Sequence, residues 1–224
     1  MTATRAGIDT REMVVVHTAF RRELAAAPQL VRGVAAGARD RAHVVADHVQ
    51  LLLEMLHHHH TGEDDLLWPK LRERVPGELA AVVQTMEDQH FAIAVELERA
   101  QSALGPWRAS AAETVRDRLA GALERMHPLL VEHLAAEEQE ILPLAARVLT
   151  QAEWDEIGER GMAAIPRSKM PMVFGMLMAE GEPDVLRAMI GHAPLLPRVV
   201  VPRIAPRAYG RYSRQVYGIP QQRS

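Results

Sequence analysis

Apolar side chains recur every three or four residues along most of the first 150 positions, which is the spacing of one face of an α-helix. A first helix is predicted over residues 9–27, ending at Pro28. Three longer periodic stretches follow, over about 39–75, 78–104 and 109–149, and glycine and proline residues mark the breaks between them. Four long helices joined by short breaks predict an all-α fold, an up-down four-helix bundle.

Residues 150–224 follow a different pattern. Thr150 and Glu153 have the spacing of a capping box, which predicts a short fifth helix. Two further short helices are predicted over 171–180 and 183–190, in a segment whose methionines we expect to pack in a core. From Leu196 onward helical periodicity is weak, and we predict an irregular basic arm. The chain therefore divides into a bundle over 1–149 and a C-terminal extension over 150–224.

Charge supports the same division. Residues 1–150 carry 16 Lys and Arg against 22 Asp and Glu, a net of −6, whereas residues 151–224 carry 10 against 7, a net of +3. No apolar run approaches the roughly 18 residues that a membrane span needs, and the N-terminal residues lack the apolar stretch of a signal peptide. We therefore expect a cytoplasmic protein without a transmembrane segment, and no nucleic acid as partner.

The absence of cysteine limits the possible chemistry. It excludes disulfides, thiolate zinc sites and cysteine nucleophiles, and leaves imidazole and carboxylate as the strong metal ligands. Ten of the eleven histidines lie in the first 150 residues. Iron, manganese, copper and zinc all remain compatible with such ligands.

One motif occurs twice, a histidine and a glutamate four residues apart with a proline six residues further on. The copies are HHTGEDDLLWP, with His59, Glu63 and Pro69, and HLAAEEQEILP, with His133, Glu137 and Pro143. In both, an acid directly follows the glutamate. Residues four apart lie about 40° apart around a helix, so the imidazole and carboxylate point the same way and can hold one ion. Both prolines are expected to kink their helices.

Each predicted helix offers at least one inward-facing candidate ligand. His17 follows Met13 by one helical turn, and His59 follows Met55 in the same way, so both lie on faces that should be buried. Two carboxylates with neutral imidazoles suit a pair of divalent ions held about 3.5–4 Å apart by bridging carboxylates. The candidate ligands are His17, His59, Glu63, His90, His133 and Glu137.

The run from His57 to His60 needs separate treatment, because four consecutive residues sweep about 300° around a helix. His59 fits the inward phase best. His60 lies about 100° away and could reach a second ion, so its ligation stays open. His57 and His58 are expected to be solvated or to contact the ligands from outside, and His48 is expected to be a core histidine.

A competing pattern is ExxH, the motif of ferritin-like di-iron carboxylate bundles, which occurs at Glu54, Glu87 and Glu124. That fold also needs a lone inward glutamate on each of the other two helices. Helix one offers only Glu12 and Glu23, and neither shares the phase of His17. The HxxxE pattern therefore explains more of the sequence.

The segments HTAFRREL, HHHHTGEDDLLWP, MEDQHFAI and HLAAEEQEILP, in this order, resemble the hemerythrin-like HHE cation-binding family over residues 10–149. The chain looks like a bacterial member with a C-terminal extension. The resemblance implies a hemerythrin-like bundle with two non-haem iron ions, bridged by carboxylates and by an oxo or hydroxo group. It implies that Glu63 and Glu137 are the bridges and that the histidine ligands are His17, His59, His90 and His133.

One position departs from the family pattern. Oxygen-carrying hemerythrins have a further histidine one turn before the third-helix ligand, where this chain has Met86. One iron then lacks an imidazole unless His60 supplies it. A more open iron favours sensing, or reaction with oxygen, peroxide or nitric oxide, over reversible oxygen carriage. The alternatives are a ferroxidase or iron-storage protein, and a metal-dependent sensor whose basic arm binds a protein partner, so enzymatic activity is left open.

Overall fold

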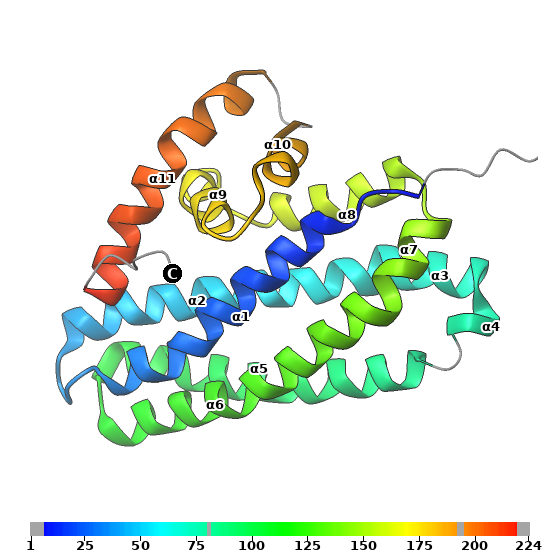
Figure 1. Cartoon of the computed structure of the whole chain (residues 1–224). Helices are drawn as coiled ribbons and strands as arrows, with labels where there is room; N and C mark the ends of the chain where they lie inside the picture. Colours follow the sequence, from blue (N-terminus) through cyan, green and yellow to red (C-terminus); the bar gives the residue numbers. More distant parts are fainter. Residues whose placement is uncertain (1–6, 80–81, 192–194, 219–224) are drawn as a thin grey trace, which may run out of the picture.

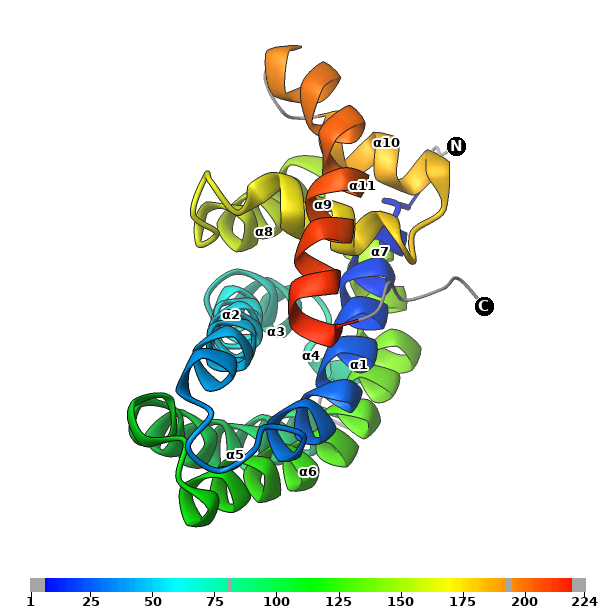
Figure 2. The same cartoon turned by 90° about the vertical axis from the view of Figure 1, so that its left-hand side faces the viewer.

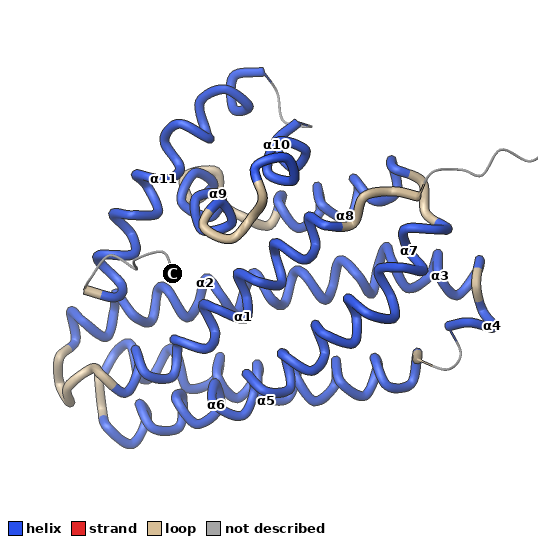
Figure 3. The backbone as a smooth tube through the Cα atoms, viewed as in Figure 1, coloured by secondary structure: helices blue, strands red, loops and turns tan. Residues whose placement is uncertain are grey.

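The computed structural model describes residues 7–79, 82–191 and 195–218, and within these ranges the chain is helical with no strand (Figure 3). The four long helices are α1 (Arg11–Arg32), α2 (Arg39–Gly62), α5 (Val83–Ser110) and α6 (Glu113–Ala136). Consecutive long helices run antiparallel, and seen end-on they form a ring in the order α1, α2, α5, α6 (Figures 1 and 2). The predicted up-down four-helix bundle is confirmed. No helix in the described ranges is long and apolar enough to cross a membrane.

Apolar residues at helical spacing fill the centre of this ring. Leu24, Leu52, Ile93 and Leu123 come one from each long helix, and each is at most 1% exposed. Full burial of such a side chain contributes about 1.5–3 kcal/mol. The amphipathic period of the sequence is thus what holds the four helices together.

Each HxxxE motif ends in a short π-helical turn, η1 (Glu63–Leu67) after α2 and η2 (Glu137–Ile141) after α6. The turns lead into α3 (Trp68–Arg74) and α7 (Leu142–Val148), which begin one residue before a proline. Because Pro69 and Pro143 have no N–H, the α-helical hydrogen bond at that point cannot form. Trp68 and Leu142 instead donate to the carbonyls of the glutamates five residues back. The predicted kinks are therefore wide turns that begin at the candidate ligands.

Two predicted helix ends are wrong. Helix α1 continues through Pro28 to Arg32, and α5 continues through Gly105 and Pro106 to Ser110. In both cases residues beyond the proline are fully buried, Val31 in α1 and Trp107 in α5. Burial of these side chains outweighs the lost backbone hydrogen bond. After α3 a single turn, α4 (Pro76–Leu79), precedes α5.

The first part of the extension folds as predicted. Helix α8 (Gln151–Ala163) opens with the Thr150–Glu153 capping box, and α9 (Met170–Met178) and α10 (Pro183–Gly191) follow. These helices lie over the α1–α2 side of the bundle (Figure 2). Met172 and Met176 are buried in the same apolar cluster as the bundle core, so these methionines serve packing. His192, the one histidine beyond residue 150, lies outside the described residues.

The irregular arm predicted from Leu196 is wrong, because residues Leu195–Tyr217 form a helix, α11, that crosses α9. Ala205, Tyr209 and Val216 recur at helical spacing and are 9% exposed or less. Their burial outweighs the two internal prolines. The Arg203 side chain also donates to the carbonyl of Val199, a residue of the turn that precedes Pro202.

The crossing of α9 and α11 depends on Gly175. A Cβ at this position would lie 2.3 Å from the carbonyl oxygen of Ala205 and 2.7 Å from Cβ of Tyr209. We expect Gly175→Ala to force the helices apart and to lower the free energy of unfolding by about 1–3 kcal/mol in a denaturant titration. Gly105→Ala, where a Cβ meets nothing within 4 Å, is the control and should be neutral or stabilising. Equal effects would contradict the close approach.

Candidate metal centre

The structure brings all seven candidate residues together inside the bundle. They come from every long helix and both π turns, and they form two groups. Within each group the nitrogen and oxygen ligand atoms all lie within 4.8 Å of one another. The first group contains His17, His59, Glu63 and Glu137. The second contains His60, Glu63, His90 and His133. Glu63 belongs to both groups.

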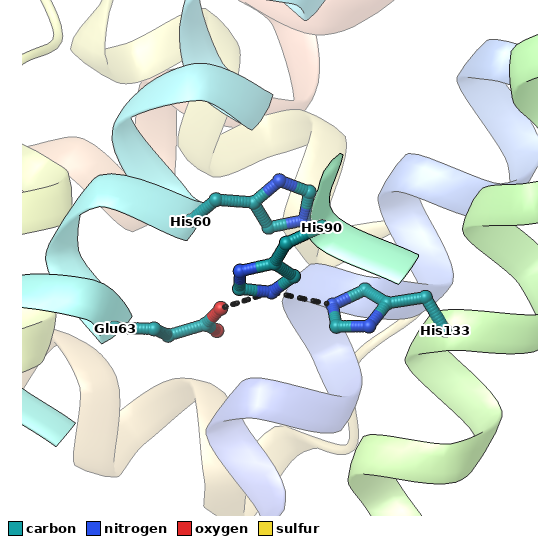
Figure 4. A group of neighbouring side chains, drawn as sticks. All are labelled: His60, Glu63, His90 and His133. Carbon is teal, nitrogen blue, oxygen red and sulfur yellow. Dashed lines mark hydrogen bonds and ion pairs between the residues drawn. The ribbon is translucent and has the colours of Figure 1, made fainter. Parts of the chain in front are cut away.

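In the second group three imidazoles and one carboxylate converge on a common point (Figure 4). His90 Nε2 lies 3.2 Å from His133 Nε2 and 3.8 Å from Glu63 Oε2. The His60 ring stacks on that of His90, with centroids 4.5 Å apart. Met86 is buried and lies in a separate apolar cluster. The third imidazole of this group therefore comes from His60 on α2.

The two inward glutamates lie between the groups. Glu63 Oε1 is 3.1 Å from His59 Nε2 in the first group, whereas Oε2 faces His90 in the second. Glu137 Oε2 is 3.3 Å from His17 Nε2 and 4.0 Å from His133 Nε2. Each carboxylate can therefore contact an ion in either group, which is the geometry that a bridging ligand needs.

Most of the converging atoms are buried and lack a hydrogen bond, although Nε2 of His90 and Nε2 of His133 lie 3.2 Å apart. His17 and His133 are fully buried, and Glu63 and Glu137 are 1% exposed. Among the described residues no hydrogen-bond partner exists for Nε2 of His17, His59 and His60, or for either carboxylate oxygen of Glu63 and Glu137. An unpaired buried polar group costs about 1–3 kcal/mol, so this many together are unusual unless cations satisfy them. The donor set fits a pair of divalent metal ions.

Burial sets the protonation states that a metal requires. It lowers the pKa of His133 to about 3, helped by the neighbouring His90 and His17, and it lowers the pKa of His59 and His60 well below 6.5. These imidazoles are therefore neutral at pH 7, with lone pairs free for coordination. Burial and the nearby Glu137 raise the pKa of Glu63 well above 4.5, and the positive charge of a bound cation would oppose that shift.

Comparison with known families agrees with this donor set. The hemerythrin HHE cation-binding domain model matches residues 9–145, which is more than half of the chain. The chain belongs to the hemerythrin HHE cation-binding family. No curated protein and no solved structure matches it. The hemerythrin domain contains all seven candidate ligands, and α8 to α11 lie outside it.

Two carboxylates of the hemerythrin domain position its histidines, a role the sequence analysis missed. Glu138 accepts a hydrogen bond from His17 Nδ1 at 2.9 Å, and Asp64 Oδ1 lies 3.3 Å from His90 Nδ1. Burial raises the pKa of Glu138, but hydrogen bonds from His17 and Arg21 outweigh it and hold that pKa below 4.5. Each is the acid directly after a motif glutamate and reaches a histidine on another helix. The presence of this acid in both copies of the motif is the sequence signal from which the role could have been predicted.

We expect Asp64→Asn to weaken metal binding without removing a ligand. A carboxylate on the far nitrogen fixes the ring orientation and raises the basicity of a metal-bound histidine, and its loss costs about 10–100-fold in affinity. Competition with a chromogenic chelator measures this. Asp65→Asn is the matched control, because Asp65 is exposed and pairs with Arg160. Identical affinities for the two variants would contradict the positioning role.

The competing ExxH pattern does not form a site. Glu54, Glu87 and Glu124 are all exposed, and Glu124 pairs with Arg32. His57 and His58 are exposed, as predicted. His48 is buried with its Nδ1 2.8 Å from the Tyr212 hydroxyl, which confirms a hydrogen-bonded core histidine.

Proposed function

We propose that the hemerythrin domain holds two non-haem iron ions and that this centre binds dioxygen or reacts with peroxide or nitric oxide. The two groups of unpaired buried atoms that share Glu63 carry the proposal. The ligands would be the seven residues of these groups, with Glu63 and Glu137 as bridges. Bound iron would supply the redox chemistry with such small molecules, for which imidazole and carboxylate ligands are suited.

The chain itself contributes binding, orientation and exclusion of water. Each group offers four side chains, which leaves an iron ion free to accept a small exogenous ligand. Apolar side chains surround the ligands, including Phe20, whose ring centroid lies 5.3 Å from that of His59. His60, on α2, would supply the imidazole that α5 lacks at Met86.

The test is to load the protein with ferrous iron, remove the excess, and add oxygen or hydrogen peroxide while recording optical spectra. We expect a new charge-transfer band and net loss of peroxide over repeated additions. Stable, reversible oxygenation with slow autoxidation would contradict peroxide turnover. Ferric iron accumulating far beyond two ions per chain would favour the ferroxidase or iron-storage alternative.

A second candidate, a metal-dependent sensor with a protein partner, is favoured by the surface of α11. Seven large apolar residues are exposed in the described part of the chain, and five of them lie within Leu195–Ile204. Farther along the same helix Arg207, Arg211 and Arg214 are exposed, and α11 contains no acidic residue. Such a face suits an acidic partner with an apolar centre.

The partner hypothesis predicts that this protein, when immobilised, captures an acidic protein partner. The amount captured should fall as salt is added and should change when iron is removed. The double substitution Arg207→Glu and Arg211→Glu should abolish capture and leave iron content unchanged. Capture that ignores salt, iron and these substitutions would rule out this candidate.

A further inference from the structure

A large apolar pocket lies between the hemerythrin domain and its C-terminal extension. Its volume is about 710 Å³, within the range of about 300–1,000 Å³ typical of small-molecule sites. Helices α1 and α2 form one wall, and α8, α9, α10 and α11 form the other. Both parts of the chain are therefore needed to build it.

The pocket reaches the candidate metal centre through His59. Phe20 and His59 both line it, and His59 Nε2 lies 3.1 Å from Glu63 Oε1. A molecule in the pocket would lie against the ring of a proposed iron ligand. The pocket is thus a neighbour of the centre rather than part of its ligand set.

The lining is apolar and partly adaptable. Met55, Met170, Met189, Phe174 and Leu177 are among its walls. Methionine side chains are flexible and polarisable, so they can repack around ligands of different outline. Burying apolar surface here would provide most of the binding free energy.

The polar atoms of the lining restrict the ligand further. Two carboxylates, Glu54 and Glu159, line the pocket against one arginine, Arg167. The lining therefore carries net negative formal charge, which disfavours carboxylates, sulfonates and phosphates.

We propose that this pocket binds an apolar organic molecule without negative charge, and that the bound molecule packs against His59. The binding step does not require iron. Only an effect of the bound molecule on the metal centre would rest on the proposed function. Fatty acids and nucleotides are disfavoured by their charge.

The test uses two fluorescent probes with the same ring system, uncharged N-phenyl-1-naphthylamine and its anionic 8-sulfonate, 1-anilinonaphthalene-8-sulfonate. We expect the uncharged probe to bind with one site per chain, and the sulfonate to bind about tenfold more weakly at low salt. Equal affinity for both probes, or no saturable binding of the uncharged one, would overturn the proposal.

A matched pair of glycine variants locates the binding. Gly161 lines the pocket on α8, and a Cβ there meets nothing within 4 Å, so Gly161→Phe should fill the pocket without distorting the helix. Gly105→Phe makes the same change at an open helical position that does not line the pocket. We expect Gly161→Phe to lower the affinity for the uncharged probe at least about tenfold and Gly105→Phe to leave it unchanged. Unchanged binding to Gly161→Phe would place the probe elsewhere and overturn the proposal.

Iron content, measured on the same samples, keeps the two proposals apart. Saturable binding of the uncharged probe to protein without iron supports the pocket even if the di-iron proposal fails. Two irons per chain without probe binding supports the metal centre and overturns the pocket.

Discussion

Replacing Glu63 by glutamine is expected to reduce iron binding from two ions per chain to fewer than one. Glu63 is the only residue shared by the two groups of candidate ligands, and its two carboxylate oxygens face different groups. A neutral amide keeps the shape of the side chain but removes the charge that offsets the two cations. Metal analysis after gel filtration measures the effect. Glu140→Gln, an exposed position in the other π turn, is the control and should keep both ions.

Although Glu63→Gln should lower iron binding, it should raise the stability of the metal-free protein. Burial raises the pKa of Glu63, so at pH 7 the folded metal-free chain carries an unfavourable buried carboxyl group. Glutamine removes that cost, and we expect metal-free Glu63→Gln to be more stable than metal-free wild type, on the order of 1 kcal/mol. A variant that loses iron and is also less stable without metal would indicate general misfolding instead.

Acidification is expected to destabilise the metal-free protein strongly between pH 6.5 and about pH 3. The pKa of His133 is lowered by burial from 6.5 in the unfolded chain to about 3 in the folded one. In this window the unfolded chain binds the proton and the folded chain does not. The free energy of unfolding is therefore highest above pH 6.5 and decreases as the pH falls toward 3. For this histidine alone the decrease is up to about 5 kcal/mol. His59 and His60 shift in the same direction and add to the loss.

Denaturant titrations of metal-free Glu63→Gln at a series of pH values test this prediction. In the wild type, the raised pKa of Glu63 makes the folded state bind more protons than the unfolded state above pH 4.5, which opposes the effect of the histidines. The variant removes this contribution. His133→Phe should flatten the pH dependence in this window. A free energy of unfolding that stays constant from pH 6.5 to 4 would contradict the neutral buried histidines.

Much of the centre could be predicted from the sequence because its signal is local. Four-residue spacing places His59 beside Glu63 and His133 beside Glu137 on one helix face, and that geometry follows from the α-helix itself. The π turns could not be predicted in the same way. Pro69 and Pro143 mark an interruption, but the hydrogen bond from the preceding residue to the glutamate carbonyl is known only from the structure.

The features that escaped prediction depend on contacts between distant segments. The sequence left the role of His60 open, because its position in the second group follows from the packing of α2 against α5, which brings its ring onto His90. Asp64 and Glu138 acquire their roles because they reach histidines on other helices. Helix α11 forms because Tyr209 and Val216 are buried against other elements, whereas its local sequence, with two prolines, favours an irregular chain.

The most direct test of the central claim is an anaerobic titration with ferrous iron followed by metal analysis, on wild type and on His60→Ala. The arrangement of two ligand groups that share Glu63 predicts two irons per wild-type chain. It predicts one tightly bound iron in His60→Ala, because the first group is intact. A single iron in the wild-type chain, or two equally tight irons in His60→Ala, would contradict the account.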